Sequence, residues 1–232
     1  MEDAEITKLG ELERTHWWYT ERRTILRREL PPLSEHKIAL DIGAAVGANT
    51  EVLARRGWRA IGIDTSQLAA AAIFARGFPG MLASACSLPF ADSSVGLVVA
   101  YDVLEHIPDD LQAASEIFRV LHPGGHFLVS VPCDMRLWSE HDIAVGHVRR
   151  YSRNEIVELL EKAGFDIDHV WSWNVILRPV VAMRRKNSKG SDLDRVPKLT
   201  NTALRGIVAL ERYAPLGRLP GVSLFLRARR PA

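Results

Sequence analysis

The chain has 232 residues, 47% of them hydrophobic and 25% charged, and its formal net charge is +2. These values are typical of one globular domain and give no bulk case for binding nucleic acid. Two distant cysteines, Cys86 and Cys133, favour neither a disulfide framework nor a zinc site and fit a reducing cytoplasm.

The cellular location can also be predicted from the sequence. The N-terminal stretch M-E-D-A-E is acidic and has no apolar core, so we expect no signal peptide. No apolar run reaches 18 residues, so we expect no membrane span. The expected location is the cytoplasm.

Residues 1–30 are predicted to be helical, because Leu9, Leu12, His16, Tyr19 and Arg23 recur at a spacing of three to four, and Pro31-Pro32 ends the run. We interpret the two tryptophans after His16 as cover for one edge of a sheet. Tyr19 and Arg23 suit a lid instead, because an aromatic face with a cation one turn away fits a ligand that has a flat base and a carboxylate.

Apolar runs and helical patterns then alternate along the chain. Strands are expected at 37–41, 59–63, 81–83, 95–100, 126–131 and 165–173, and helices at 49–56, 67–76, about 110–121 and 153–163. This rhythm predicts a doubly wound, Rossmann-like α/β fold with a mostly parallel sheet. Residues 222–229 alternate like an edge strand. The segment 174–220 before them is predicted to be two helices around a loop at 186–197, an insertion inside a hairpin of the last two strands.

The most informative stretch is the turn between the first strand and the first sheet-covering helix. Asp41 ends the strand, and Gly43 and Gly47 follow in the turn. Asp64 ends the next strand about 20 residues further on, which is the spacing of an acid that accepts the ribose hydroxyls of a nucleotide. A dehydrogenase would show G-x-G-x-x-G, but Ala45 stands at the second glycine position.

Further motifs follow in order, namely Leu88-Pro89-Phe90, Val103-Leu104-Glu105-His106 and Leu121-x-Pro123-Gly124-Gly125. With them, the chain resembles class I S-adenosylmethionine-dependent methyltransferases, in particular the small-molecule branch of the bacterial type 11 and type 12 enzymes. The match covers about residues 12–161. The resemblance implies a seven-stranded sheet in a single domain of residues 1–232, with a helical lid (1–32), a cofactor-binding half (36–132), a substrate side (133–173), a cap insertion (174–220) and an edge strand (221–232).

The resemblance also implies roles for individual residues toward S-adenosylmethionine, which leaves as S-adenosylhomocysteine. Gly43 and Gly47 let the backbone meet the methionine part of the cofactor, and Asp64 holds both ribose hydroxyls. Ser84 and Ala85 recognise adenine by side chain and backbone N–H, and Tyr101 and Asp102 line the methyl-donor side. The expected cofactor-binding residues are Tyr19, Arg23, Asp41, Gly43, Ala45, Gly47, Asp64, Thr65, Ser84, Ala85, Tyr101 and Asp102.

Three positions depart from the family pattern. Ala45 stands where many members have a middle glycine, Ser84 replaces the usual Asp, and Val95-Gly96 replaces the usual Phe-Asp. We expect cofactor binding to persist with altered affinity.

The polar stretch after the fifth strand is the expected place for catalysis. His141, beside Asp142, or His147 would accept a proton from the acceptor. Alternatively, these histidines pin the loop through hydrogen bonds together with Arg149 and Tyr151, and the sharing of this stretch across the branch favours pinning. Metal ligation by His141, Asp142 and His147 matches no familiar spacing, so no metal is expected. His106 is expected to be structural.

The insertion carries Arg178, Arg184, Arg185, Lys186 and Lys189 beside an apolar stretch. It suits a solvated helix face, a substrate cap or an interfacial helix on anionic lipid, and we favour the cap.

The expected activity is methyl transfer to an O or N atom of a small-molecule acceptor, a natural product or a sugar-like molecule. The alternatives are a catalytically silent cofactor-binding module that acts through a partner, and a methyltransferase of lipid-linked substrates in peripheral contact with a membrane. The oligomeric state is left open.

Overall fold

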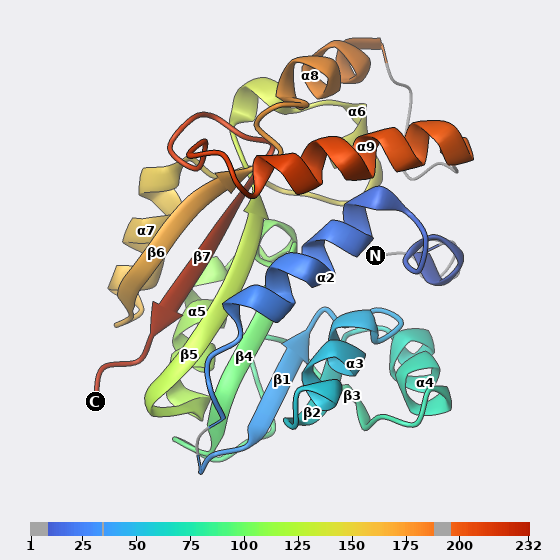
Figure 1. Ribbon diagram of the computed structural model, residues 1–232. Coiled ribbons are helices and arrows are strands. Elements are labelled where there is room, and N and C mark those ends of the chain that lie inside the picture. Colours follow the sequence, from blue (N-terminus) through green and yellow to red (C-terminus); the bar gives the residue numbers. More distant parts are fainter. Residues whose placement is uncertain (1–8, 34, 188–195) are drawn as a thin grey trace.

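Figure 1 shows the computed structural model, which describes residues 9–33, 35–187 and 196–232. A seven-stranded sheet forms the centre, in the order β3-β2-β1-β4-β5-β7-β6. The strands are β1 (Ile38–Ile42), β2 (Arg59–Asp64), β3 (Gly80–Leu82), β4 (Val95–Tyr101), β5 (Leu121–Pro132), β6 (Asp166–Trp173) and β7 (Ser223–Arg229). The first five pair in parallel, whereas β7 is antiparallel to both β5 and β6. The predicted doubly wound, mostly parallel sheet is confirmed.

Helices cover both faces of this sheet (Figure 1). They are α2 (Trp17–Glu29), α3 (Ala48–Arg55), α4 (Gln67–Ala75), α5 (Asp110–Val120), α6 (Glu140–Ala144), α7 (Arg153–Lys162), α8 (Arg178–Asn187) and α9 (Lys198–Glu211). Helices α5 and α7 pack on one face, and α2 and α3 pack on the other. Every residue of β4 is buried, as expected for a strand covered on both sides.

The expectation that residues 222–229 form an edge strand is wrong. Strand β7 lies between β5 and β6, and β6 is the edge. The side chains give the reason: Leu224 and Leu226 of β7 pack into the core on one face and Phe225 into the core on the other. By contrast, β6 begins with the exposed Asp166 and also exposes Asp168. Charged residues on an outer strand discourage pairing with another chain.

The N-terminal helical region is interrupted, in contrast to the continuous helix expected for residues 1–30. Residues 9–12 are helical, a turn follows, and α2 starts only at Trp17. His16 causes the break, because its backbone is extended (φ −67°, ψ 133°) and its side chain caps α2 by accepting a hydrogen bond from the N–H of Trp18. Helix α2 ends before Pro31, as predicted.

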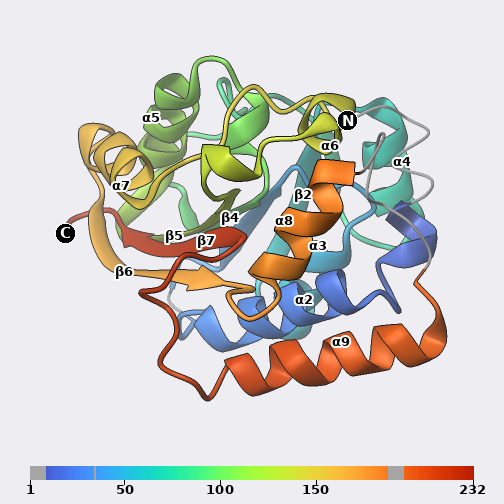
Figure 2. The same ribbon diagram turned by 90° about the horizontal axis from the view of Figure 1, so that it is seen from above.

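The insertion contains the two expected helices, α8 and α9, while part of the loop between them, with Lys189, lies outside the described residues. Figure 2 shows α9 running beside α2. Two hydrogen bonds join α9 to the start of α2 and to the turn before it: the N–H of Trp17 donates to Oδ1 of Asn201 (2.8 Å), and Nδ2 of Asn201 donates to the carbonyl of Thr15 (2.9 Å). In the part of the chain that the structure describes, no helix combines the length and the apolar character needed to cross a bilayer.

Candidate active site

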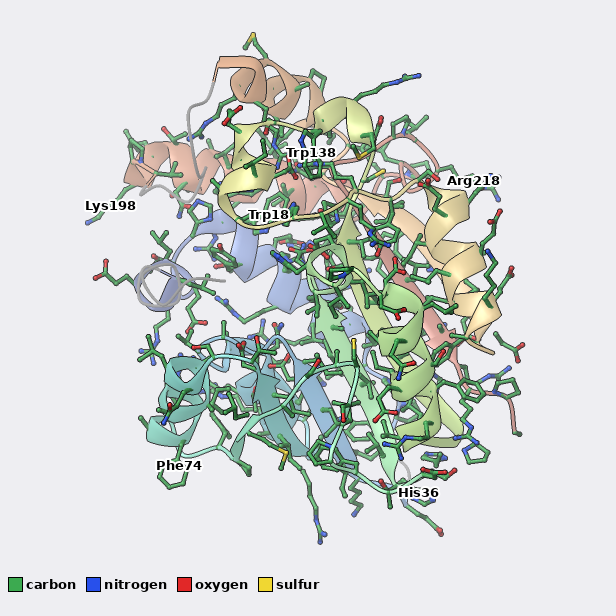
Figure 3. All side chains as sticks on the ribbon, turned by 180° about the vertical axis from the view of Figure 1, so that it is seen from behind. Trp18, His36, Phe74, Trp138, Lys198 and Arg218 are labelled. Atoms are coloured by element: carbon green, nitrogen blue, oxygen red, sulfur yellow. The ribbon has the colours of Figure 1, made fainter. Side chains whose placement is uncertain are left out.

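A cavity of about 300 Å³ opens at the carboxyl ends of the parallel strands, the edge at which open α/β sheets bind ligands. In Figure 3, Trp18 of α2 and Trp138 after β5 both lie toward this end of the molecule, whereas His36, just before β1, lies at the opposite end. The cavity lining includes eight of the residues predicted from sequence, namely Tyr19, Arg23, Gly43, Ala45, Tyr101, Asp102, His141 and His147.

The remaining predicted cofactor residues lie outside the lining of this cavity, in β1, the glycine turn, the end of β2 and the loops after β2 and β3. They are Asp41, Gly47, Asp64, Thr65, Ser84 and Ala85. Asp64 joins two of these segments, because its carboxylate accepts hydrogen bonds from the N–H groups of Ala45 (3.0 Å) and Ser66 (2.9 Å). Ser84 is exposed, and its hydroxyl accepts from the N–H of Cys86 (3.2 Å).

The glycine turn is held in a tight backbone conformation. Gly43, Ala45 and Gly47 all have positive φ, at 67°, 48° and 84°. A Cβ on Gly43 would lie 2.6 Å from a methyl group of Val103, so only glycine fits there. Asp41 lies beneath the turn, fully buried, and accepts a hydrogen bond from the hydroxyl of Thr50 (2.7 Å). Burial raises the pKa of Asp41 to about 7.

Arg22 is a functional candidate that the sequence analysis missed. It is buried and lines the cavity. Its Nη2 pairs with Asp102 (2.9 Å) and donates to the hydroxyl of Ser130, and its guanidinium lies 5.3 Å from the ring centroid of Tyr101. A hydrogen-bonded cation within an aromatic cage is a rigid wall for a polar ligand. The adjacent Arg22-Arg23 pair was the available signal, and both arginines in fact line the cavity.

The loop after β5 is fixed by a buried carboxylate. Asp142 accepts hydrogen bonds from Nδ1 of His147 (2.8 Å), from Nε (2.8 Å) and Nη2 (3.0 Å) of Arg150, and from the N–H of Ser139 (2.9 Å). Burial raises the pKa of Asp142, but the bonds from His147 and Arg150 outweigh burial, so its pKa lies below the ordinary value. Asp142 is therefore an anion that anchors this loop.

A second set of bonds ties the end of the same loop to α5. The guanidinium of Arg149 pairs with Asp110, and the hydroxyl of Tyr151 donates to Asp110 (2.7 Å). Of the residues expected to pin the loop, His147, Arg149 and Tyr151 make hydrogen bonds that hold it.

Glu105 is the second residue that the sequence analysis did not single out. It is fully buried, it lines the cavity, and neither of its carboxylate oxygens has a hydrogen-bond partner among the residues described. Burial and the nearby charge of Asp102 raise its pKa well above the ordinary value. His106 and His147 lie beside it, with their ring centroids 4.8 Å apart. Burial and His147 lower the pKa of His106 to about 4.

The three residues considered as metal ligands from the sequence, His141, Asp142 and His147, are not the group of ligands that the fold brings together. His141 and Asp142 are adjacent, but Asp142 is occupied by Arg150 and His147. Instead, the ligand atoms of Glu105, His106 and His147 lie within 4.8 Å of one another. His106, expected to be structural, faces the cavity with them.

Comparisons with known proteins agree with the fold and the turn. Residues 40–129 match the type 11 family model described as a methyltransferase domain. A Mycolicibacterium smegmatis protein named "Probable S-adenosylmethionine-dependent methyltransferase" is 34% identical over 173 residues, which are 71% of this chain and 65% of that relative. The chain thus spans just under two thirds of the relative's length.

Two solved structures share the fold across most of this chain. One comes from a complex between the Haloferax volcanii Trm112 methyltransferase activator and a methyltransferase (TM-score 0.69, 21% identity, covering 99% of this chain and 96% of that one). The other is Haemonchus contortus phosphoethanolamine N-methyltransferase 2 in complex with S-adenosylmethionine (TM-score 0.64, 20% identity, covering 91% and 53%). By its fold, its glycine turn and these matches, the chain is similar to the class I S-adenosylmethionine-dependent methyltransferases, and its residues 40–129 match the type 11 family within that class.

Proposed function

We propose that the protein moves the methyl group of S-adenosylmethionine to an oxygen or nitrogen atom of a small-molecule acceptor, a natural product or a sugar-like molecule. The acceptor's lone pair forms the new bond to the methyl carbon while the carbon–sulfur bond breaks, which converts the sulfonium to the thioether of S-adenosylhomocysteine. In such an in-line displacement, the enzyme contributes mainly by positioning the two molecules and excluding water.

The observation that carries this proposal is the composition of the cavity wall. The lining includes Gly43, Ala45 and Tyr101, which are expected to face the methyl donor. It also includes His141 and His147 of the loop after β5 and Val181 of the insertion. A donor and an acceptor can thus meet in a single cavity, and we assign the insertion the role of a cap.

The proposed proton acceptor for a hydroxyl substrate is His141 or His147. Both line the cavity, and their ring centroids are 6.2 Å apart. For a hydroxyl acceptor, either His141→Ala or His147→Ala should slow turnover by about 10²–10⁴-fold while S-adenosylhomocysteine binding stays unchanged. Unchanged rates of both variants would point to an amine acceptor or to catalysis by proximity alone.

A catalytically silent module is less well supported. Gly96, one of the departures that suggested it, has a packing explanation, because a Cβ there would lie 1.9 Å from the carbonyl oxygen of His36. The acceptor side of the cavity is also lined by the loop and insertion residues that a silent module would not require.

A lipid-linked acceptor is the second candidate, and the surface of the insertion favours it. Ile176, Val180 and Met183 are exposed at 45%, 52% and 64%, on the same segment as the cavity-lining Val181 and Arg184. An apolar face beside cations suits a membrane surface with anionic lipid. Flotation with phosphatidylglycerol vesicles distinguishes the candidates: the lipid proposal expects binding that Val180→Asp reduces, and the small-molecule proposal expects none.

The proposed function is tested first by calorimetry with S-adenosylhomocysteine. We expect binding by the wild-type protein and at least tenfold weaker binding by Asp64→Ala, because a carboxylate that accepts two hydroxyl bonds contributes roughly 1.5–3 kcal/mol for each. Since Asp64 also accepts from Ala45 and Ser66, thermal unfolding must show that the variant is folded. No binding by the wild-type protein would refute the proposal, and equal affinity of a folded Asp64→Ala would refute the role of Asp64.

A further inference from the structure

We propose that Glu105, His106 and His147 bind a divalent transition-metal ion at the acceptor side of the cavity. These residues come from two segments, the turn after β4 and the loop after β5. Each contributes one ligand atom, and the three atoms lie within 4.8 Å of one another. All three side chains line the cavity, so an ion bound there can be reached by a ligand.

The hydrogen bonds of the two histidines leave one ring nitrogen of each available to a metal. Nδ1 of His147 lies 2.8 Å from the carboxylate of Asp142, and Nδ1 of His106 lies 3.1 Å from the carbonyl oxygen of Gly146. Both partners are acceptors, so each Nδ1 carries the proton and each Nε2 presents a lone pair. The bond from His147 to Asp142 is the outer-shell arrangement that fixes metal-binding histidines in other proteins.

Glu105 supplies the independent evidence for a cation. It is a fully buried carboxyl group whose two oxygens have no hydrogen-bond partner within the described part of the chain. Burying such a group without a partner is costly. The nearby arginines bond elsewhere, since Arg22 pairs with Asp102 and Arg150 with Asp142. A bound cation would satisfy Glu105.

The spacing and the donor set define the class of ion. Metal–nitrogen and metal–oxygen distances of roughly 2.0–2.2 Å mean that two ligands of one ion lie at most about 4.4 Å apart. Oε1 of Glu105 and Nε2 of His147 are already 3.8 Å apart, and a pair at the 4.8 Å limit of the trio would have to come closer when the ion binds. Two imidazoles with one carboxylate favour zinc, iron or cobalt over magnesium and calcium.

Three protein ligands leave coordination positions open, as in catalytic rather than structural sites. The open side faces the cavity, where the ion could hold and polarise an acceptor oxygen; this role rests on the proposed function. With His147 bound to the ion, His141 is the histidine left to take the acceptor's proton. Metal binding itself requires no acceptor and is tested without one.

The test is titration of chelator-treated protein with zinc chloride by calorimetry and with cobalt chloride by visible absorption. We expect one equivalent of each ion to bind, and the cobalt spectrum to show nitrogen coordination. Glu105→Gln keeps the shape of the side chain but removes the anionic ligand, and His106→Gln removes one imidazole. Each variant should weaken binding at least tenfold. His122→Gln is the matched control, because His122 stacks on His36 away from the cavity (ring centroids 4.1 Å apart).

S-adenosylhomocysteine affinity, measured on the same preparations, reports whether each variant is folded and tests the cofactor site separately. Loss of binding by Glu105→Gln and His106→Gln with an unchanged His122→Gln supports the site. No binding by a wild-type protein that still binds S-adenosylhomocysteine overturns it, and the proposed methyl transfer then stands without a metal. Retention of binding by both cavity variants, with loss in His122→Gln, assigns the ion to the surface histidine pair and also overturns the proposal.

Discussion

Ala45 combines a side chain with a backbone conformation that favours glycine. Its φ of 48° lies in the left-handed region, which costs an L-residue roughly 1–2 kcal/mol. The N–H of Ala45 donates to Asp64, so the conformation connects the glycine turn to the end of β2. The sequence showed that a methyl group replaces the usual hydrogen, but only the structure shows that the departure lies at a strained position.

Asp41 should make stability depend on pH. Burial raises its pKa to about 7, whereas the unfolded chain titrates near the ordinary 3.8. Between these values the folded state holds the extra proton, so the free energy of unfolding falls as pH rises from about 4 to 7. Asp41→Asn removes the titrating carboxyl group and with it this pH dependence. Between pH 5 and pH 8, the free energy of unfolding of the variant should therefore rise by on the order of 3 kcal/mol relative to that of the wild type.

The measurement for Asp41 is urea unfolding of the cofactor-free protein at both pH values. Glu161→Gln, which removes an exposed carboxyl group, is the control and should show no such gain. Equal pH dependence of wild type and Asp41→Asn would show that Asp41 titrates normally in the folded state.

The position of a residue at the cavity could be predicted where a motif sets it, whereas a role that depends on burial could not. Tyr101 and Asp102 follow a recognisable apolar strand, and both line the cavity. Glu105 lies within a motif as well, but the sequence of that motif does not indicate that the carboxylate of Glu105 is buried without a hydrogen-bond partner. Arg22 and Arg23 are adjacent, and the sequence alone could not tell which one enters the aromatic cage.

At the scale of elements, the alternation of strands and helices was sufficient to predict the parallel half of the sheet. The order of the last two strands was not, because V-S-L-F-L-R-A-R reads as an alternating strand whether or not a partner covers it. The continuous helix expected for residues 1–30 is interrupted for a local reason: the 3–4 spacing continues through His16, but the backbone of His16 is extended and its side chain caps α2. A capping histidine has no reliable sequence signature.

The loop after β5 should depend on Asp142 for its stability. Replacing Asp142 with Ala leaves the guanidinium of Arg150 buried without its partner, and breaking a buried pair in this way costs about 3–5 kcal/mol. We expect the urea midpoint of Asp142→Ala to fall accordingly. Glu140→Ala, an exposed neighbour in α6, is the control and should leave the midpoint nearly unchanged. A stable Asp142→Ala would show that the loop is held mainly by Asp110 and its partners.

Across the whole molecule, the N-terminal helical segment expected to form the lid contacts the insertion, although the 141 residues of 33–173 lie between them in the sequence. Helix α9 packs along α2, Arg212 pairs with Glu21 (2.9 Å), and Asn201 joins both sides of the break at His16. The sequence predicted a lid and a cap as separate features. It could not predict that they contact each other, because neither segment has a sequence pattern that indicates which other segment it packs against. The cavity wall is therefore built by residues from both ends of the chain.

This coupling predicts that a residue distant from the cofactor controls its binding. Asn201→Ala removes the bonds to Trp17 and Thr15, and each such bond contributes about 0.5–1.5 kcal/mol. Less ordering of the lid should weaken S-adenosylhomocysteine binding by roughly five- to tenfold and increase hydrogen exchange at the start of α2. Thr202→Ala is the matched control, because the hydroxyl of Thr202 donates to the carbonyl of Lys198 within α9. If Asn201→Ala keeps both wild-type affinity and wild-type protection, the lid closes without support from the insertion.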